Sequence, residues 1–388
     1  MSGHAGTSYL GQWVIPEPVP LLEALSMVSR GQVIEVALGV LKIPTDGSPP
    51  STRPDMPVLD TKALIDDRVS AIRRFHEAVG NPHAELDLSG GVDSAVMLGL
   101  LARALDPDKI TPVYTSIHSS AGSRACAGEC AAAFGVRLVE LDLTKLFDEL
   151  IADMRKALID IGHSAAELDA RARMDPTVLG SIRSCLRAPV GRGFNRMTGG
   201  GIRHGTGNEC EDRWLRFYQK GGDGEVDTNP IAMLAKGEIY QLARALTVPR
   251  SIIEALPSPD LHGISAQHND EDEIRALSGL EWTYSRISWD SGEYTRVGTI
   301  EMLSRFLDGH PQLMQLEPLP EAELDALARA AEPIFERSHS VVVTFLESAR
   351  ALERASRHKH NPNCSSLGSR GELVDRHILT NQLPSLHA

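Results

Sequence analysis

Residues 86–94, with the sequence LDLSGGVDS, decide the fold of this chain. They follow a short apolar segment at Ala84–Leu88 that is typical of a strand, and they lead into a Leu- and Ala-rich helix at Ala95–Leu105. Glycines allow backbone N–H groups to approach an anion closely, and a helix N-terminus adds unpaired donors and partial positive charge. The stretch is therefore predicted to be a phosphate-binding loop between a strand and a helix.

The segments on either side of this loop alternate between helix and strand patterns. This alternation predicts an α/β fold, a doubly wound parallel sheet flanked by helices, in which ligands bind beyond the C-terminal ends of the strands. Residues 1–55 are expected to be an extension and linker, 56–275 the core domain, and 276–388 a mainly helical C-terminal region. Helices are expected at 61–79, 124–134, 145–190, 238–246, 251–256, 298–307, 321–335 and 341–356, strands at 110–115 and 136–141, and a loop at 192–204.

Composition excludes several classes of protein. The 388-residue chain has a formal net charge of -13 at pH 7, whereas binding to a nucleic-acid backbone needs a basic surface. Its 5 cysteines are too few for a disulfide framework, and Cys126 and Cys130 lack a second pair of soft ligands for a metal site. Because no apolar run could span a membrane and residues 1–13 lack a secretory pattern, we expect a cytoplasmic protein without membrane or nucleic-acid partners.

The loop offers specific groups to a nucleotide. Ser89 and Ser94 can donate hydrogen bonds to phosphate oxygens, whereas Asp93 would repel phosphate unless it held a bridging divalent cation. A Walker loop would end in Gly-Lys-Ser/Thr, which this stretch lacks. The sequence SGGVDS instead resembles the signature of N-type ATP pyrophosphatases, the PP-loop enzymes of the adenine nucleotide alpha hydrolase-like fold, which cleave ATP to AMP and pyrophosphate. The alternative is an ordinary Gly- and Ser-rich helix cap.

A second block of motifs distinguishes among the PP-loop families. An asparagine synthetase would begin with a cysteine nucleophile, a GMP synthetase carries a separate amidotransferase domain, and tRNA-thiolating enzymes need paired catalytic cysteines. Over roughly residues 59–275 the chain is instead similar to the ammonia-dependent NAD synthetase family, with a weaker echo at His358-Lys359. The motifs that carry this resemblance are GTGNECE (205–211), KGGDG (220–224), DTNP (227–230), Lys236 and PSPDL (257–261).

The resemblance implies a role for each matching position. Asp93 and Glu211 would bind Mg²⁺, and together with Lys236 they would be the catalytic residues. The implied ATP contacts are Ser89, Gly90, Gly91, Val92, Asp93, Ser94, Thr206, Lys236 and Ser258. The implied contacts to the dinucleotide substrate are Lys220, Asp227, His358 and Lys359.

The reaction implied by the resemblance uses ATP to adenylate a carboxylate, the nicotinate carboxylate of deamido-NAD. Ammonia then displaces AMP and forms the amide of NAD. The residues position the reactants and stabilise the charge of the departing pyrophosphate. The family resemblance also implies a homodimer, with ammonia taken from solution or from a separate glutaminase.

The chain departs from the family in the half that would bind the acceptor. Residues 181–187 (SIRSCLR) stand where the family shows Asn-x-x-x-Arg-x-Arg, so Cys185 occupies the arginine position, with Arg183 or Arg187 as candidate substitutes. The sequence GGGI at 199–202 stands where an apolar strand is expected. These departures keep two alternatives open, an amide synthetase for a different carboxylic acid and a non-catalytic nucleotide-binding protein.

Overall fold

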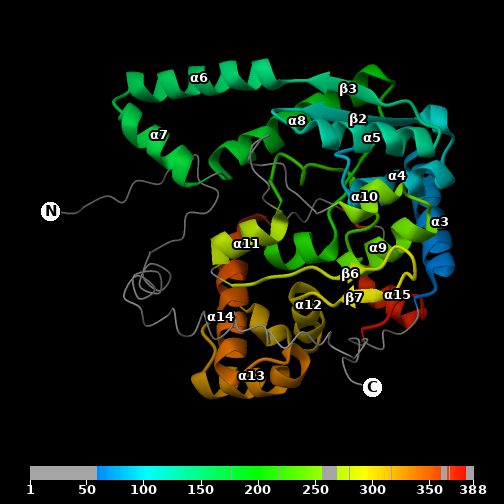
Figure 1. The fold of residues 1–388 in the computed structure, drawn as a ribbon. Coiled ribbons are helices and arrows are strands. Elements are labelled where there is room, and N and C mark those ends of the chain that lie inside the picture. Colours follow the sequence, from blue (N-terminus) through cyan, green and yellow to red (C-terminus); the bar gives the residue numbers. More distant parts are fainter. Residues whose placement is uncertain are drawn as a thin grey trace.

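The computed structural model describes residues 59–175, 177–216, 218–255, 269–278, 280–315, 317–359, 365–366 and 368–381. The expectations for residues 1–55 and for Ser258 lie outside these residues, and so does the side chain of His358. Figure 1 shows the arrangement of the described elements.

A six-stranded sheet lies at the centre of the fold, and each pair of neighbouring strands is parallel. The strand order is β3-β2-β1-β4-β5-β8, so β1 has β2 on one side and β4 on the other. The predicted doubly wound α/β fold is confirmed. The strands are β1 (Ala84–Asp87), β2 (Ile110–Ser116), β3 (Val139–Asp142), β4 (Ile202–His204), β5 (Thr228–Asn229) and β8 (Ser365–Ser366).

Helices pack on both faces of the sheet because the side chains of β1 alternate between them. Ala84 and Leu86 lie in the main apolar core with residues of α3, α4 and α9. Glu85 points to the opposite face, where its carboxylate lies close to Gly191 of α8. The helices around the sheet are α3 (Thr61–Val79), α4 (Val92–Ala104), α5 (Ala121–Ala133), α8 (Thr177–Met197), α9 (Lys236–Ala245) and α10 (Arg250–Glu254), with a 3₁₀ turn η1 at Pro107–Lys109.

The order of the strands creates a switch point between β1 and β4. The chain runs outward from β1 through β2 to β3 and then returns through α6 (Thr144–Asp160), α7 (Ala165–Met174) and α8 to the far side of β1. Figure 1 shows α6 and α7 extending beyond the edge of the sheet before α8 brings the chain back. Because consecutive loops diverge at such a point, the C-terminal ends of β1 and β4 are where a sheet of this kind is expected to bind its ligand.

A second apolar core unites the C-terminal helices in the lower layer of Figure 1. Trp282 is fully buried there and meets the Phe345 ring edge-on at 4.7 Å between centroids. Cys210 and Ala235 also belong to this core, so it reaches the segments that follow β4 and β5. The elements of this part are α11 (Asp270–Ser278), β6 (Arg286–Ile287), β7 (Tyr294–Arg296), α12 (Thr299–Gly309), η3 (Pro311–Met314), α13 (Glu321–Phe335), α14 (His339–Ser356), η4 (Arg357–Lys359) and α15 (Arg370–Asp375).

The prediction of a loop at 192–204 is wrong for most of these residues. Residues 192–197 continue α8, and 202–204 form β4, which pairs with β1 although GGGI lacks an apolar pattern. Buried Asn195 closes the turn between them, since its side-chain amide donates to the Gly201 carbonyl (2.8 Å) and its oxygen accepts from the Gly201 N–H (2.6 Å). A strand therefore stands before Gly205 after all.

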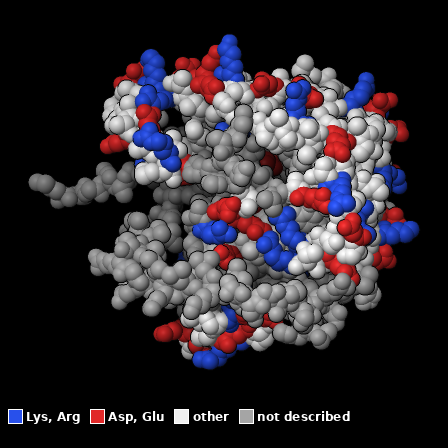
Figure 2. All heavy atoms as spheres, viewed as in Figure 1, with Lys and Arg blue, Asp and Glu red and all other residues white. Residues whose placement is uncertain are grey.

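Basic and acidic side chains are interspersed over the face shown in Figure 2. None of the helices in the described part of the chain combines the length and apolar character that a bilayer span requires.

Candidate active site

The loop between β1 and α4 has the conformation that phosphate binding needs. Gly90 has φ +88°, and a Cβ there would lie 2.4 Å from the Ser123 carbonyl oxygen, so only glycine fits. Ser89 and Ser94 place their hydroxyl oxygens 3.2 Å apart across the loop. Gly91 is the N-cap of α4 without a side-chain cap bond, so backbone donors of the first turn remain open to an anion.

The loop after β4 brings a second carboxylate to the same place. Gly205 and Thr206 follow the strand directly, and the chain then enters the π-helical turn η2 (Cys210–Leu215), which carries Glu211. Asn208 is fully buried, and its side-chain oxygen accepts from the backbone N–H groups of Cys210 (3.0 Å) and Glu211 (3.2 Å). Its amide nitrogen donates to Asp93 Oδ1 at 2.9 Å. One side chain therefore links the two loops.

Lys236, the first residue of α9, completes the cluster. Its Nζ lies 2.6 Å from Asp93 Oδ2 and 2.8 Å from Glu211 Oε1. The lysine side chain is 1% exposed, against 17% for Asp93 and 16% for Glu211, so the ammonium lies beneath the carboxylates and they form the accessible surface. The ring of Tyr284 lies 5.1 Å from Nζ and covers it from the C-terminal region.

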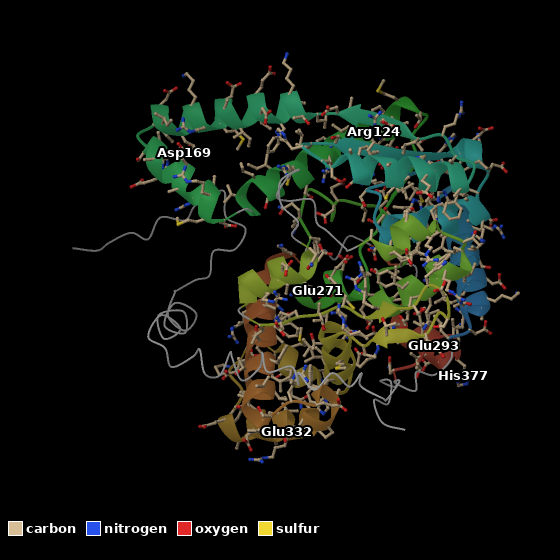
Figure 3. The ribbon with its side chains drawn as sticks, in the orientation of Figure 1. Arg124, Asp169, Glu271, Glu293, Glu332 and His377 are labelled. Atoms are coloured by element: carbon tan, nitrogen blue, oxygen red, sulfur yellow. The ribbon has the colours of Figure 1, made fainter. Side chains whose placement is uncertain are left out.

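The position of Tyr284 is itself fixed by an acidic residue of α11. Glu271, labelled in Figure 3 between the upper and lower layers, accepts the backbone N–H of Tyr284 at 3.0 Å. The same carboxylate pairs with Arg296, whose Nε donates to the Tyr284 carbonyl at 2.9 Å. The C-terminal region thus contributes to the wall of the cluster.

Charge interactions stabilise the ionised form of Lys236. Burial opposes its charge, but the Asp93 and Glu211 carboxylates outweigh that effect and hold the pKa of Lys236 well above its usual range. Burial acts in the opposite sense on Glu211 and raises the pKa of that carboxyl, against the attraction of Lys236. The cluster therefore contains one firmly held cation and a carboxylate whose charge is disfavoured by burial and favoured by that cation.

Residues expected to contact the acceptor are engaged within the protein. The Arg192 guanidinium donates two hydrogen bonds to Asp227, at 2.6 and 2.9 Å. The same carboxylate accepts the backbone N–H of Arg203 at 2.8 Å. Arg192 therefore lowers the pKa of Asp227 even though burial opposes ionisation. Lys359 is buried and donates to the carbonyls of Arg216 (3.1 Å) and Tyr218 (2.7 Å).

The helix that would carry the family's substrate arginine packs against the KGGDG segment. Cys185 is half-buried, with its sulfur 3.9 Å from the Lys220 carbonyl, while the Lys220 side chain is exposed. Ser184 donates to Asp223 at 2.7 Å. Of the two candidate substitutes, Arg187 reaches the Thr115 carbonyl at 3.3 Å, whereas Arg183 lies against the Phe147 ring.

Comparison with known proteins agrees with this geometry. A family model described as NAD synthase matches residues 64–281. This chain belongs to the NAD synthase family. The family's enzymes are ligases that form a carbon–nitrogen bond with ATP as co-substrate, and the resemblance seen in the motifs is confirmed.

Two of the relatives are named NH(3)-dependent NAD(+) synthetase. The protein of Thermoplasma acidophilum is 30% identical over 214 residues, which cover 54% of this chain and 80% of the relative. That of Methanococcoides burtonii is 28% identical over 220 residues, covering 56% and 75%. The solved structure of NMN synthetase from Francisella tularensis matches with a TM-score of 0.55 and 18% identity over 78% of this chain and 97% of that one, a likeness of fold alone.

The structure of this NAD synthase family member brings together the residues expected at its ATP site. Asp93, Glu211 and Lys236 meet near the ends of β1 and β4, and Thr206 lies in the loop that leads from β4 to the turn carrying Glu211. The expected acceptor contacts Asp227 and Lys359 belong to separate ion-pair and carbonyl networks, and Lys220 is exposed.

Asp93 and Glu211 fit a hard divalent cation. Asp93 Oδ2 lies 2.6 Å and Glu211 Oε1 lies 2.8 Å from the same Lys236 nitrogen, so the two carboxylate oxygens are close enough to bind one ion. Among the described residues no three His, Cys, Asp or Glu side chains form a complete ligand set. The remaining ligands would be phosphate oxygens and water, as suits Mg²⁺.

Two residues of the cluster were not expected from the sequence. Asn208 lies inside GTGNECE, and its only local signal is that Asn often bonds to backbone N–H groups ahead of a helical turn. Tyr284 lies 48 residues after Lys236 in the C-terminal region, where no motif marks it. Its role depends on the packing of two separate cores, which local sequence does not show.

We expect Asn208→Ala to weaken the binding of the metal and not only the stability of the fold. Loss of the bond to Asp93 Oδ1 frees that carboxylate to rotate, and loss of such a supporting bond typically costs roughly ten- to a hundredfold in metal affinity or activity. The measurement is the rate of pyrophosphate release as the Mg²⁺ concentration is varied. The Mg²⁺ concentration that gives half of the maximal rate should be higher for the variant. Asn195→Ala is the matched control, because Asn195 is also buried but its side chain bonds to Gly201, away from Asp93 and Glu211. An equal shift in both variants would contradict a specific role of Asn208.

Proposed function

We propose that this chain is an ATP-dependent amide ligase that adenylates a carboxylate and transfers the acyl group to ammonia. The observation that carries the proposal is the meeting of Asp93, Glu211 and Lys236 beside the glycine loop, at the switch point of the sheet. The preferred acid is the nicotinate carboxylate of deamido-NAD, so that the products are NAD, AMP and pyrophosphate. Family membership and relatives named NH(3)-dependent NAD(+) synthetase support this choice.

The residues divide the work of activation between them. Backbone donors at Gly90–Ser94 and the hydroxyls of Ser89 and Ser94 hold the phosphate chain while the substrate carboxylate attacks the α-phosphorus. Lys236 supplies a fixed positive charge for the pyrophosphate that leaves. Asp93 and Glu211 would hold Mg²⁺, which neutralises phosphate charge when bound. Ammonia then attacks the acyl carbon, AMP departs, and the amine loses a proton to give the amide.

The proposal assigns the remaining expected positions by the family motif. Thr206 and Ser258 would contact ATP, while Lys220, Asp227, His358 and Lys359 would contact the acceptor. Residues 56–275 would form the catalytic domain, and residues 276–388 would complete the substrate site, as the contact of Tyr284 with Lys236 suggests. The working state would be a cytoplasmic homodimer that takes ammonia from solution or from a separate glutaminase.

A second candidate function is amide synthesis on a different carboxylic acid. It is favoured by Cys185 in the arginine position and by the internal bonds of Arg192 and Lys359, which leave fewer positive groups for an anionic dinucleotide. The chemistry at Asp93, Glu211 and Lys236 would be unchanged. Only the identity of the acid separates the two candidates.

Pyrophosphate release over a panel of carboxylic acids tests both. With ATP, Mg²⁺ and ammonium, deamido-NAD should give NAD and AMP in equal amounts. Turnover of another acid with none of deamido-NAD would establish the second function. Absence of pyrophosphate release with every acid, while Asp93→Asn gives the same background, would contradict the ligase proposal.

A further inference from the structure

The Lys236 ammonium occupies the position between the two carboxylates that would hold a metal. It contacts Asp93 Oδ2 at 2.6 Å and Glu211 Oε1 at 2.8 Å, both within hydrogen-bond distance. Asn208 binds the other oxygen of Asp93, which directs Oδ2 toward Glu211 and Lys236. The ammonium and a divalent cation would therefore share the same two oxygen atoms.

The surroundings of Lys236 leave its charge dependent on these two carboxylates. Lys236 is the first residue of α9, and the N-terminus of a helix disfavours a cation. The side chain is almost fully buried, so water contributes little to its solvation. Tyr284 covers it at 5.1 Å, and Asp270 and Tyr240 are the next ionisable groups that act on it.

We infer that Lys236 is an internal counterion that keeps Asp93 and Glu211 from holding a divalent cation until ATP binds. This inference rests on the proposed function, because it takes the two carboxylates as the metal ligands. A divalent cation entering alone would face a buried positive charge a few ångströms away, and the repulsion is strong where water is scarce. ATP removes the conflict because its phosphates give the ammonium a new partner and give the metal further ligands. The metal is then expected to enter together with the nucleotide.

Mn²⁺ binding followed by electron paramagnetic resonance tests this order, since free and protein-bound Mn²⁺ give different signals. Without nucleotide, Lys236→Gln is expected to bind Mn²⁺ roughly tenfold or more tightly than the unmodified protein, because a neighbouring positive charge is gone. Lys236→Arg keeps the charge and should bind as weakly as the unmodified protein. The double variant Lys236→Gln/Glu211→Gln should lose the gain, which places the bound ion at this pair.

The result that would overturn the inference is equal Mn²⁺ affinity in the unmodified protein and Lys236→Gln. A thermal melt of each variant, with and without Mn²⁺, gives a second measurement if Lys236→Gln is less stable. Mn²⁺ should then raise the melting temperature of Lys236→Gln more than that of the unmodified protein, and the reverse order would also overturn the inference. Pyrophosphate release by the unmodified protein with Mg²⁺, ATP, ammonium and the acid panel is measured separately. Its absence would contradict the ligase proposal, whereas equal Mn²⁺ affinity of the unmodified protein and Lys236→Gln would contradict only this inference.

Discussion

Asp93→Asn is expected to lower the rate of pyrophosphate release about a hundred- to a thousandfold, the size of effect seen when one charge-stabilising group is removed from an active site. The substitution keeps the shape of the side chain and the bond from Asn208, but it removes the charge that Asp93 Oδ2 presents to Lys236 and to a metal. The fold should persist because Lys236 keeps Glu211 as a partner. The measurement is pyrophosphate release at saturating ATP, with far-ultraviolet circular dichroism to check the fold.

Asp108→Asn is the matched control for this change. Asp108 lies in η1 with its side chain 86% exposed, and its ion pair with Arg137 spans 3.5 Å at the surface. Its rate should stay within a factor of about two of the unmodified protein, because isolated surface pairs contribute little. Equal rates for Asp93→Asn and Asp108→Asn would remove Asp93 from the mechanism.

Arg203→Met is expected to destabilise the protein by about 3–5 kcal/mol at pH 8, the cost of leaving a buried charge without its partner. Arg203 is 1% exposed on β4, and its guanidinium holds Glu85 at 2.8 and 3.0 Å and Asp87 at 2.5 Å. Removing it leaves the Glu85 and Asp87 carboxylates of β1 without the cation that hydrogen-bonds to both of them. Chemical denaturation curves at several pH values measure the change.

The pH dependence of this loss follows from Glu85. Burial raises the pKa of Glu85 from 4.5 to about 7, an effect that the nearby Arg203 only partly offsets. A raised pKa in an acid means that the folded protein binds the proton more tightly than the unfolded chain, so stability falls as the pH rises from about 4.5 to 7. Arg203→Met should therefore cost least near pH 5, where Glu85 is protonated, and most near pH 8.

Two further variants separate charge from packing in this prediction. Arg203→Met/Glu85→Gln should recover part of the loss at pH 8, because one buried charge is gone. Arg124, labelled in Figure 3, pairs with Glu140 at the surface, so Arg124→Met should change stability by less than about 1 kcal/mol. A loss that is the same at pH 5 and pH 8 would show that packing rather than charge dominates at Arg203.

Elements with a strong local pattern were predicted well from the sequence. The helix expected at 61–79 is found as α3, Thr61–Val79, because its apolar spacing is reinforced at both ends. Asp60 caps its start with a bond to the Ala63 N–H, and Gly80 adopts the left-handed conformation that ends it. Local chemistry alone specifies such an element.

Elements that depend on distant partners were missed. Strand β4 has no apolar run, and it forms because Ile202–His204 pairs with β1 and because Arg203 meets Glu85 and Asp87. The last turns of α8 were not predicted for a related reason. Gly191 lies against Arg203, and only glycine leaves room there for the guanidinium. Glycine at such a position reports close packing, whereas in a sequence it suggests a loop.

The candidate site divides in the same way. The glycine loop and Asp93 follow from a local strand, loop and helix pattern, and the family motif supplied Glu211 and Lys236. Asn208 and Tyr284 could not be singled out, because their importance comes from contacts across the fold. The acceptor half is the least predictable part, since its departures at Cys185 and 199–202 alter the positions that the resemblance would have assigned.

The central place of β1 also has a consequence for how the chain acquires its structure. Pairing of β1 with β4 closes a long chain segment, because Glu85 and Arg203 are 118 residues apart in the sequence. Contacts so far apart in sequence form late and slow folding, because the entropy of closing the loop is lost before the contacts stabilise it. Strands β1, β2 and β3 can associate earlier, since shorter connections join them. Nucleotide competence should therefore appear in the last phase of refolding, after most of the secondary structure has formed.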